Sequence, residues 1–104
     1  MGYSGQRWEW RTRVRSRYRI QVPAVLRPLL LASGIGPGVF VEVGVMPVEG
    51  WGSVYWITRM PSEWRITIPE VYRDEYLKPG ELVEVSLRLV LKPEEVSEDD
   101  KKRL

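Results

Sequence analysis

Apolar and polar residues alternate along two separate stretches of this chain. The first is WEWRTRVRSRYRIQV, residues 8–22, and the second comprises SVYWITRM and WRITI, residues 53–60 and 64–68. A period of two, with many β-branched and aromatic residues, is typical of half-buried β-strands. Each stretch therefore predicts one or two strands, bent near Ser16 in the first and near Ser62 in the second.

Pro23 and Pro69 close these strand regions, and a segment with a helical pattern follows each proline. The two segments are AVLRPLLLAS (24–33), which places Pro28 in its first turn, and EVYRDEYL (70–77). We expect a helix of two to three turns in each of them.

A further strand follows each helix. The segments VFVEVGVMPV (39–48) and LVEVSLRLVL (82–91) are rich in valine and lie behind glycine-containing turns that end with Gly38 and Gly80. The predicted unit is therefore β-β-α-β, and it occurs twice.

The two units are copies of one another. When the sequence is shifted by 46 positions, residues 10–31 lie over residues 56–77 with ten identities in twenty-two positions. After a difference of four residues in loop length, PGVFVEV (37–43) lies over PGELVEV (79–85). The chain is a tandem duplication.

Each copy is too small to bury a core alone, so the duplication predicts one domain. We expect a mainly β fold over residues 1–92, namely a six-stranded pseudo-twofold barrel with two short helices, built from repeats at about 8–48 and 54–91. The remaining segment, 93–104, is highly charged, and we expect it to be disordered or a loosely attached helix.

Charge is distributed unevenly over the two halves of the chain. Residues 1–52 hold seven Arg and three Glu, whereas residues 53–104 hold nine Lys plus Arg and eleven Asp plus Glu. Within the basic half, RTRVRSRYR (11–19) has arginine at every second position. In one extended strand these arginines would share a face with a spacing of about 6.6 Å, which is inside the screening length of about 8 Å. The row predicts an anionic partner.

Composition excludes several kinds of chemistry. The chain has no His and no Cys, so it lacks the usual triads, thiol nucleophiles and zinc ligands. The acids Glu70, Asp74 and Glu75 suit the start of a helix without any catalytic role. GIGPG (34–38) matches no phosphate-binding motif and is read as a turn. We expect no enzyme activity, no metal and no cofactor.

The segment RITIPEVYRDEYLKPGELVEV (65–85) resembles the core motif of the AbrB/SpoVT/MazE swapped-hairpin transcription factors, in which a strand ending in Ile-Pro leads to a short helix, a Pro-Gly turn and a strand. The looser first copy resembles it too. The related cradle-loop barrels, of double-psi and RIFT type, share the β-β-α-β unit. Tyr18 and Trp64 stand where that family has a glycine.

The resemblance implies binding of nucleic acid, DNA more than RNA, through arginines on the first strands and at the start of the helix. By that match the contacts are Arg13, Arg19, Arg27, Arg59, Arg65 and Arg73. The arginine row indicates an overlapping set, Arg11, Arg13, Arg15, Arg17 and Arg19. Because Ile57, Pro61 and Glu63 replace three of these arginines in the second copy, we expect a lopsided surface.

Alternatives remain open. The row can be a solvated edge face, and Arg27 and Arg73 can pair with nearby acids. Trp10 and Trp56 are expected in the core, whereas Trp51, between two glycines, either stacks on a base or packs within its own loop.

Besides a DNA-binding regulator, the sequence allows an RNA- or ribosome-associated factor. It also allows a protein-interaction module such as an antitoxin or adaptor and, last, an enzyme or small-ligand binder on a cradle-loop barrel. No apolar run is long enough to span a membrane and no secretory signal is visible, so we expect a cytoplasmic protein. Arginine-rich composition leans towards a thermophilic source. The oligomeric state, a monomeric pseudo-dimer or a homodimer, is open.

Overall fold

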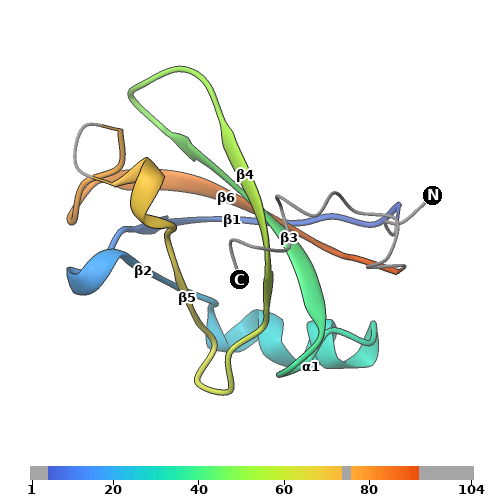
Figure 1. Cartoon of the computed structure of the whole chain (residues 1–104). Helices are drawn as coiled ribbons and strands as arrows, with labels where there is room; N and C mark the ends of the chain where they lie inside the picture. The colour runs from blue at the N-terminus through green and yellow to red at the C-terminus, as the bar shows by residue number, and fades with distance from the viewer. Residues whose placement is uncertain (1–4, 74–75, 92–104) are drawn as a thin grey trace.

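The computed structural model describes residues 5–73 and 76–91. It is mainly β, as the sequence predicts (Figure 1). Within the described residues the strands are β1 (Trp8–Arg13), β2 (Arg19–Gln21), β3 (Phe40–Pro47), β4 (Val54–Arg59), β5 (Arg65–Thr67) and β6 (Leu82–Leu89). The bends expected near Ser16 and Ser62 separate β1 from β2 and β4 from β5.

The first predicted helix is present in a shorter form. A single 3-10 turn, η2 (Ala24–Leu26), leads into α1 (Arg27–Ala32), with Pro28 in the first turn, where its missing N–H is not needed. Gly34 follows the end of the helix, and its φ of 85° is easily adopted only by glycine. The N–H of Ile35 then closes the end by donating to Leu30 O at 2.8 Å.

The prediction of a second helix over residues 70–77 is wrong. In the described part of this segment, residues 70–73 and 76–77, the only helical element is a 3-10 turn, η3 (Glu70–Tyr72), and Arg73 is already extended, with φ −85° and ψ 169°. Arg73 instead makes a parallel bridge with Leu77, and its Nε donates to Ile68 O at 2.9 Å. These tertiary contacts outweigh a weak helical pattern over a short segment.

The strands form two sheets. The larger has the order β1-β6-β3-β4 with every neighbouring pair antiparallel, and the smaller pairs β2 with β5. Hydrogen bonding among the described strands does not join the two sheets into one closed ring. The larger sheet exchanges strands between the copies, because β1 pairs with the last strand of the second copy and β4 pairs with the last strand of the first.

Equivalent residues of the two copies pair in equivalent registers. Trp10 lies opposite Val85, and Trp56 lies opposite Val43. In the small sheet Ile20 faces its own counterpart, Ile66. The register therefore agrees with the duplication read from the sequence.

The turns repeat this exchange. Val14 N donates to Glu81 O at 2.9 Å, and Gly80 N donates back to Val14 O at 2.6 Å. In the equivalent place of the other copy, Met60 N donates to Val39 O and Gly38 N donates to Met60 O. Each copy thus closes its first strand on the glycine turn of the other copy, and neither could complete its structure alone.

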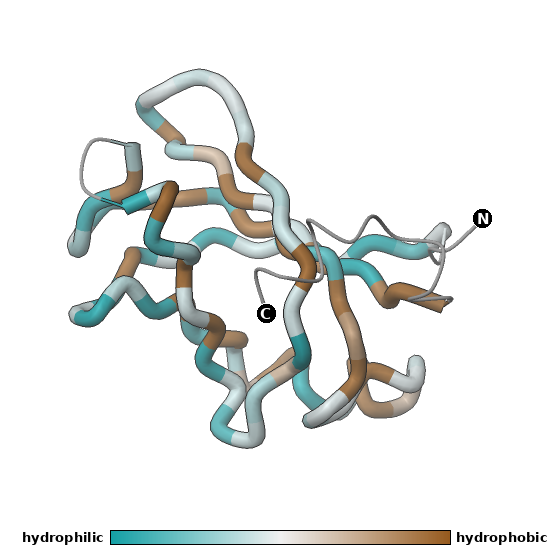
Figure 2. The backbone as a smooth tube through the Cα atoms, in the orientation of Figure 1, coloured by the Kyte–Doolittle hydropathy of each residue, from teal (hydrophilic) through white to brown (hydrophobic). Residues whose placement is uncertain are grey.

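The core lies between the sheets. Apolar and hydrophilic residues alternate along the strands (Figure 2), and the inward residues are buried, Trp10 and Trp56 among them as predicted. Ile20 and Ile66 are fully buried at the centre of the small sheet. The charged segment 93–104, predicted to be disordered or loosely attached, lies outside the described residues.

Candidate nucleic-acid interface

The five arginines of the row do not share one strand face, so that expectation is wrong. β1 ends at Arg13, and Arg15 N donates to Arg19 O at 2.8 Å, which closes a tight turn over the 3-10 segment η1 (Ser16–Tyr18). Arg11 and Arg13 lie on the exposed face of β1. Arg15, Arg17 and Arg19 belong to the turn and to the start of β2.

The turn brings three arginines of the row to one hollow. Its side chains and that of Arg65 line an open cleft of about 320 Å³. We call this hollow the basic cleft; its lining residues are Arg15, Ser16, Arg17, Arg19 and Arg65. The pairing of β2 with β5 brings Arg65 from the second copy beside the row.

Arg65 is held in place by a neighbour on β2. Its Nε donates to Gln21 Oε1 at 3.2 Å, and Gln21 Nε2 in turn donates to Trp64 O at 3.3 Å. This bond uses one edge of the guanidinium group and leaves the two terminal nitrogens, the fork that can bind a phosphate with two hydrogen bonds.

The described residues offer the row arginines of the cleft no ion-pair partner: the salt bridges of residues 5–73 and 76–91 involve only Arg11 and Arg88. Glu63 is the nearby acid. A hydrogen bond from Ser62 Oγ at 2.8 Å lowers the pKa of Glu63, and the charges of Arg19 and Arg65 lower it further. Glu63 therefore stays ionised at neutral pH and offsets part of the positive field.

The turn carries backbone strain at the cleft. Arg17 has φ 62° and Tyr18 has φ 56°. Both angles lie in the left-handed region, which residues other than glycine rarely adopt. Trp64, the counterpart of Tyr18, has φ 60°. The sequence indicates that Tyr18 and Trp64 replace a glycine, but it does not single out Arg17, which lies inside the local bridge between Arg15 and Arg19.

Arg27 and Arg73 have matching structural partners. Arg27 donates to Val22 O at 3.2 Å and lies 6.0 Å from the ring centroid of Trp64. Arg73 donates to Ile68 O and lies 5.1 Å from the ring of Tyr18. Both guanidinium groups therefore brace the aromatic residue at the left-handed position of the other copy.

The remaining predicted contacts lie outside the basic cleft. Arg11 pairs with Glu84 at 3.4 Å, and Arg13 Nη1 donates to Gly80 O at 3.0 Å. Arg59 lies over the Phe40 ring at 4.5 Å. The structure thus brings Arg15, Arg17, Arg19 and Arg65 together and gives the other five predicted arginines internal partners.

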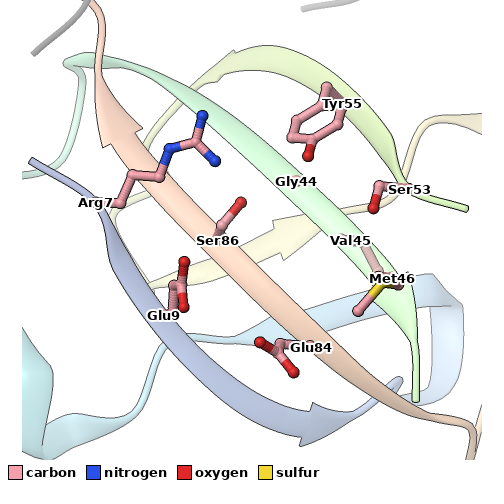
Figure 3. Close-up of a pocket in the computed structure, with 9 residues that line it drawn as sticks. All are labelled: Arg7, Glu9, Gly44, Val45, Met46, Ser53, Tyr55, Glu84 and Ser86. Atoms are coloured by element: carbon pink, nitrogen blue, oxygen red, sulfur yellow. The ribbon is translucent and has the colours of Figure 1, made fainter. Parts of the chain in front are cut away.

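A smaller hollow of about 120 Å³ lies on the outer face of the large sheet (Figure 3). Arg7, Glu9, Glu84 and Ser86 surround it, and Tyr55 extends over the strand next to Gly44. The charged side chains around this hollow, Arg7, Glu9 and Glu84, are of both signs.

No group of three acids able to hold a metal ion occurs in the part of the chain that the structure describes. Over that same part, no helix is long and apolar enough to cross a bilayer.

Among solved structures, the chain is similar to the solution structure of PHS018 from Pyrococcus horikoshii. The two are 33% identical with a TM-score of 0.66, and the match covers 82% of this chain and 92% of that one. The chain belongs to the same family as PHS018. No protein-family model matches this chain. No curated protein matches it either. The likeness to PHS018 gives the fold and the family.

Proposed function

We propose that this protein binds nucleic acid, with the basic cleft holding phosphates of the backbone, and that it acts as an AbrB-like DNA-binding regulator in the cytoplasm. The observation that carries the proposal is the convergence of Arg15, Arg17, Arg19 and Arg65 on one open hollow. Four like charges so close repel one another unless an anion neutralises them.

The architecture proposed with this function is a pseudo-twofold barrel of the cradle-loop or swapped-hairpin type. The equivalent registers of the two copies support it. So do the left-handed conformations of Tyr18 and Trp64, since the resembled family has a glycine there. Glycine adopts that conformation without strain.

Phosphate contacts position a nucleic acid but do not specify its sequence. The cleft therefore supports backbone binding with little base preference of its own. Comparison of the affinities for duplex DNA, single-stranded DNA and structured RNA identifies the preferred target.

A protein-interaction module is the second candidate, and exposed apolar side chains favour it. Leu29 and Leu31 on α1 are each about half exposed, and Val25 just before the helix is 76% exposed. An antitoxin or adaptor would bury such residues against its partner.

The proposal is tested by titrating fluorescently labelled duplex DNA, single-stranded DNA and hairpin RNA with the full chain at several salt concentrations. We expect log affinity for duplex DNA to fall against log salt with a slope of about −3.6, from about −0.9 for each of four phosphates. Absence of binding to all three probes at low salt would contradict the proposal. Purification of the full chain together with one stoichiometric protein partner would favour the second candidate.

A further inference from the structure

Trp51 is the most exposed large apolar residue described. It lies in the loop between β3 and β4 with 89% of its surface accessible, so the loop does not pack its own tryptophan. Tryptophan combines a large apolar ring with an N–H donor and is enriched at interfaces for that reason.

The loop that presents this indole is fixed from behind. Tyr76 Oη donates to Gly52 O at 2.6 Å and also lies 3.3 Å from Trp51 O. Gly52 has φ 86°, and a Cβ there would meet Tyr76 Oη at 3.2 Å. The backbone at Trp51 is therefore held while its ring faces outward, which reduces the entropy lost when a ligand stacks on it.

A largely apolar pocket of about 520 Å³ lies beside the loop. Pro47, Trp51, Val54 and Tyr76 contribute to its lining, and its single charged residue is Glu81. A pocket lined by no cation does not attract a phosphate, but a flat neutral ring fits it. Glu81 Oε1 accepts a bond from Lys78 N at 3.1 Å, and the carboxylate has further lone pairs for an amino group on a base.

A second hollow lies next to this pocket. Glu81 lines this hollow of about 300 Å³ together with Arg13, whose Nη1 donates to Gly80 O. Arg13 precedes Arg15 of the basic cleft by two residues.

We propose that the pocket beside Trp51 takes an unpaired nucleobase of a single-stranded nucleic acid whose phosphates lie on the basic cleft. This inference rests on the proposed function. Glu49 and Glu81, the acids next to Arg13, repel phosphate from the pocket side, so the backbone follows the arginines and the base turns to the indole. An exposed aromatic ring stacks on any unpaired base, whereas bases of a duplex are already stacked.

The test compares three single-stranded probes of equal length: oligodeoxycytidine, oligothymidine and an abasic deoxyribose-phosphate strand. We expect the wild-type chain to bind oligodeoxycytidine about tenfold more tightly than the abasic strand, from stacking of one base. Trp51→Ala should remove that difference and leave abasic binding unchanged, and Trp51→Phe should restore part of it. Arg15→Ser/Arg17→Ser should weaken binding of all three probes.

The outcomes separate the two proposals. Failure of the wild-type chain to bind any probe overturns the proposed function and this inference with it. Binding that is equal for base-containing and abasic strands, or that is unchanged in Trp51→Ala, overturns the inference alone. Binding of an oligolysine peptide that depends on Trp51, without any base effect, would instead show a cation site and also overturn it.

Discussion

Arg17 combines an unfavourable backbone with an exposed charge. Its φ of 62° places it in the left-handed region, and the next residue, Tyr18, is also left-handed. Such a conformation costs about 1–2 kcal/mol for a residue with a Cβ. The neighbouring positive charges of Arg15, Arg19 and Arg65 add repulsion. Strain and like charge at one residue are expected where binding, rather than stability, determines the residue type.

Arg17→Gly should therefore stabilise the protein and weaken binding. We expect the free energy of unfolding to rise by about 0.5–1 kcal/mol, because glycine adopts a positive φ without strain. Thermal unfolding measures it. Arg15→Gly is the matched control: it removes the same charge from an extended residue with φ −87° and should not stabilise. Equal behaviour of the two variants would mean that strain at Arg17 is not the cause.

At the scale of elements, β3 depends on close approach at one glycine. A Cβ on Gly44 would lie 2.5 Å from Ser86 Oγ and 2.6 Å from the Tyr55 ring, and the labelled side chains of Figure 3 lie over the same strands. We expect Gly44→Ala to lower the free energy of unfolding by about 1–3 kcal/mol, as overpacking does.

Adding Tyr55→Ala should recover part of that loss, because it removes one of the two obstructing groups. Urea unfolding of both single variants and the double variant gives the coupling. If the two changes are simply additive, the ring does not cause the effect.

The loop between β3 and β4 should loosen at high pH. Burial raises the pKa of Tyr76, and the charge of Glu81 raises it further. The protonated phenol is the form that donates to Gly52 O. Because the pKa is higher in the folded state, the stabilisation is complete below the unfolded value of about 10 and is lost as pH rises through the folded pKa.

Comparison with Tyr76→Phe isolates this effect from the other tyrosines. Below about pH 10 the variant should be less stable by about 0.5–1.5 kcal/mol, the value of one hydrogen bond, and the difference should shrink above that pH. Urea unfolding at several pH values measures it. A constant difference across the alkaline range would show that the phenol proton does not matter.

The strands could be predicted from the sequence because alternation of apolar and polar residues, as in β1 and β4, and valine-rich segments after glycine turns, as in β3 and β6, favour strands. The absence of a helix from the described part of residues 70–77 could not be predicted from the sequence, because it depends on the contacts of Arg73 with Ile68 O and the Tyr18 ring. The turn in the arginine row could not be read from the alternation either. Alternation continues through Arg15 and Arg17, but a bond to Arg19 O reverses the chain.

At the scale of the whole molecule, duplication supplies the scaffold and substitution makes the candidate site asymmetric. The two copies exchange strands and close on each other's glycine turns. Pro61 and Glu63 stand in the second copy where Arg15 and Arg17 stand in the first. The sequence could indicate that the surface is lopsided. It could not show that Arg65 joins the row, because that depends on the β2–β5 register.

The most direct test of the basic cleft is the salt dependence of duplex DNA binding by two charge-matched double variants. Arg15→Ser/Arg17→Ser removes two arginines of the cleft, whereas Arg11→Ser/Arg59→Ser removes two that already have Glu84 and Phe40 as partners. We predict that the first variant lowers the magnitude of the slope of log affinity against log salt by about 1.8, from about 0.9 per phosphate contact, and that the second leaves it nearly unchanged. Equal slopes for the two variants would contradict the assignment of phosphate binding to the cleft.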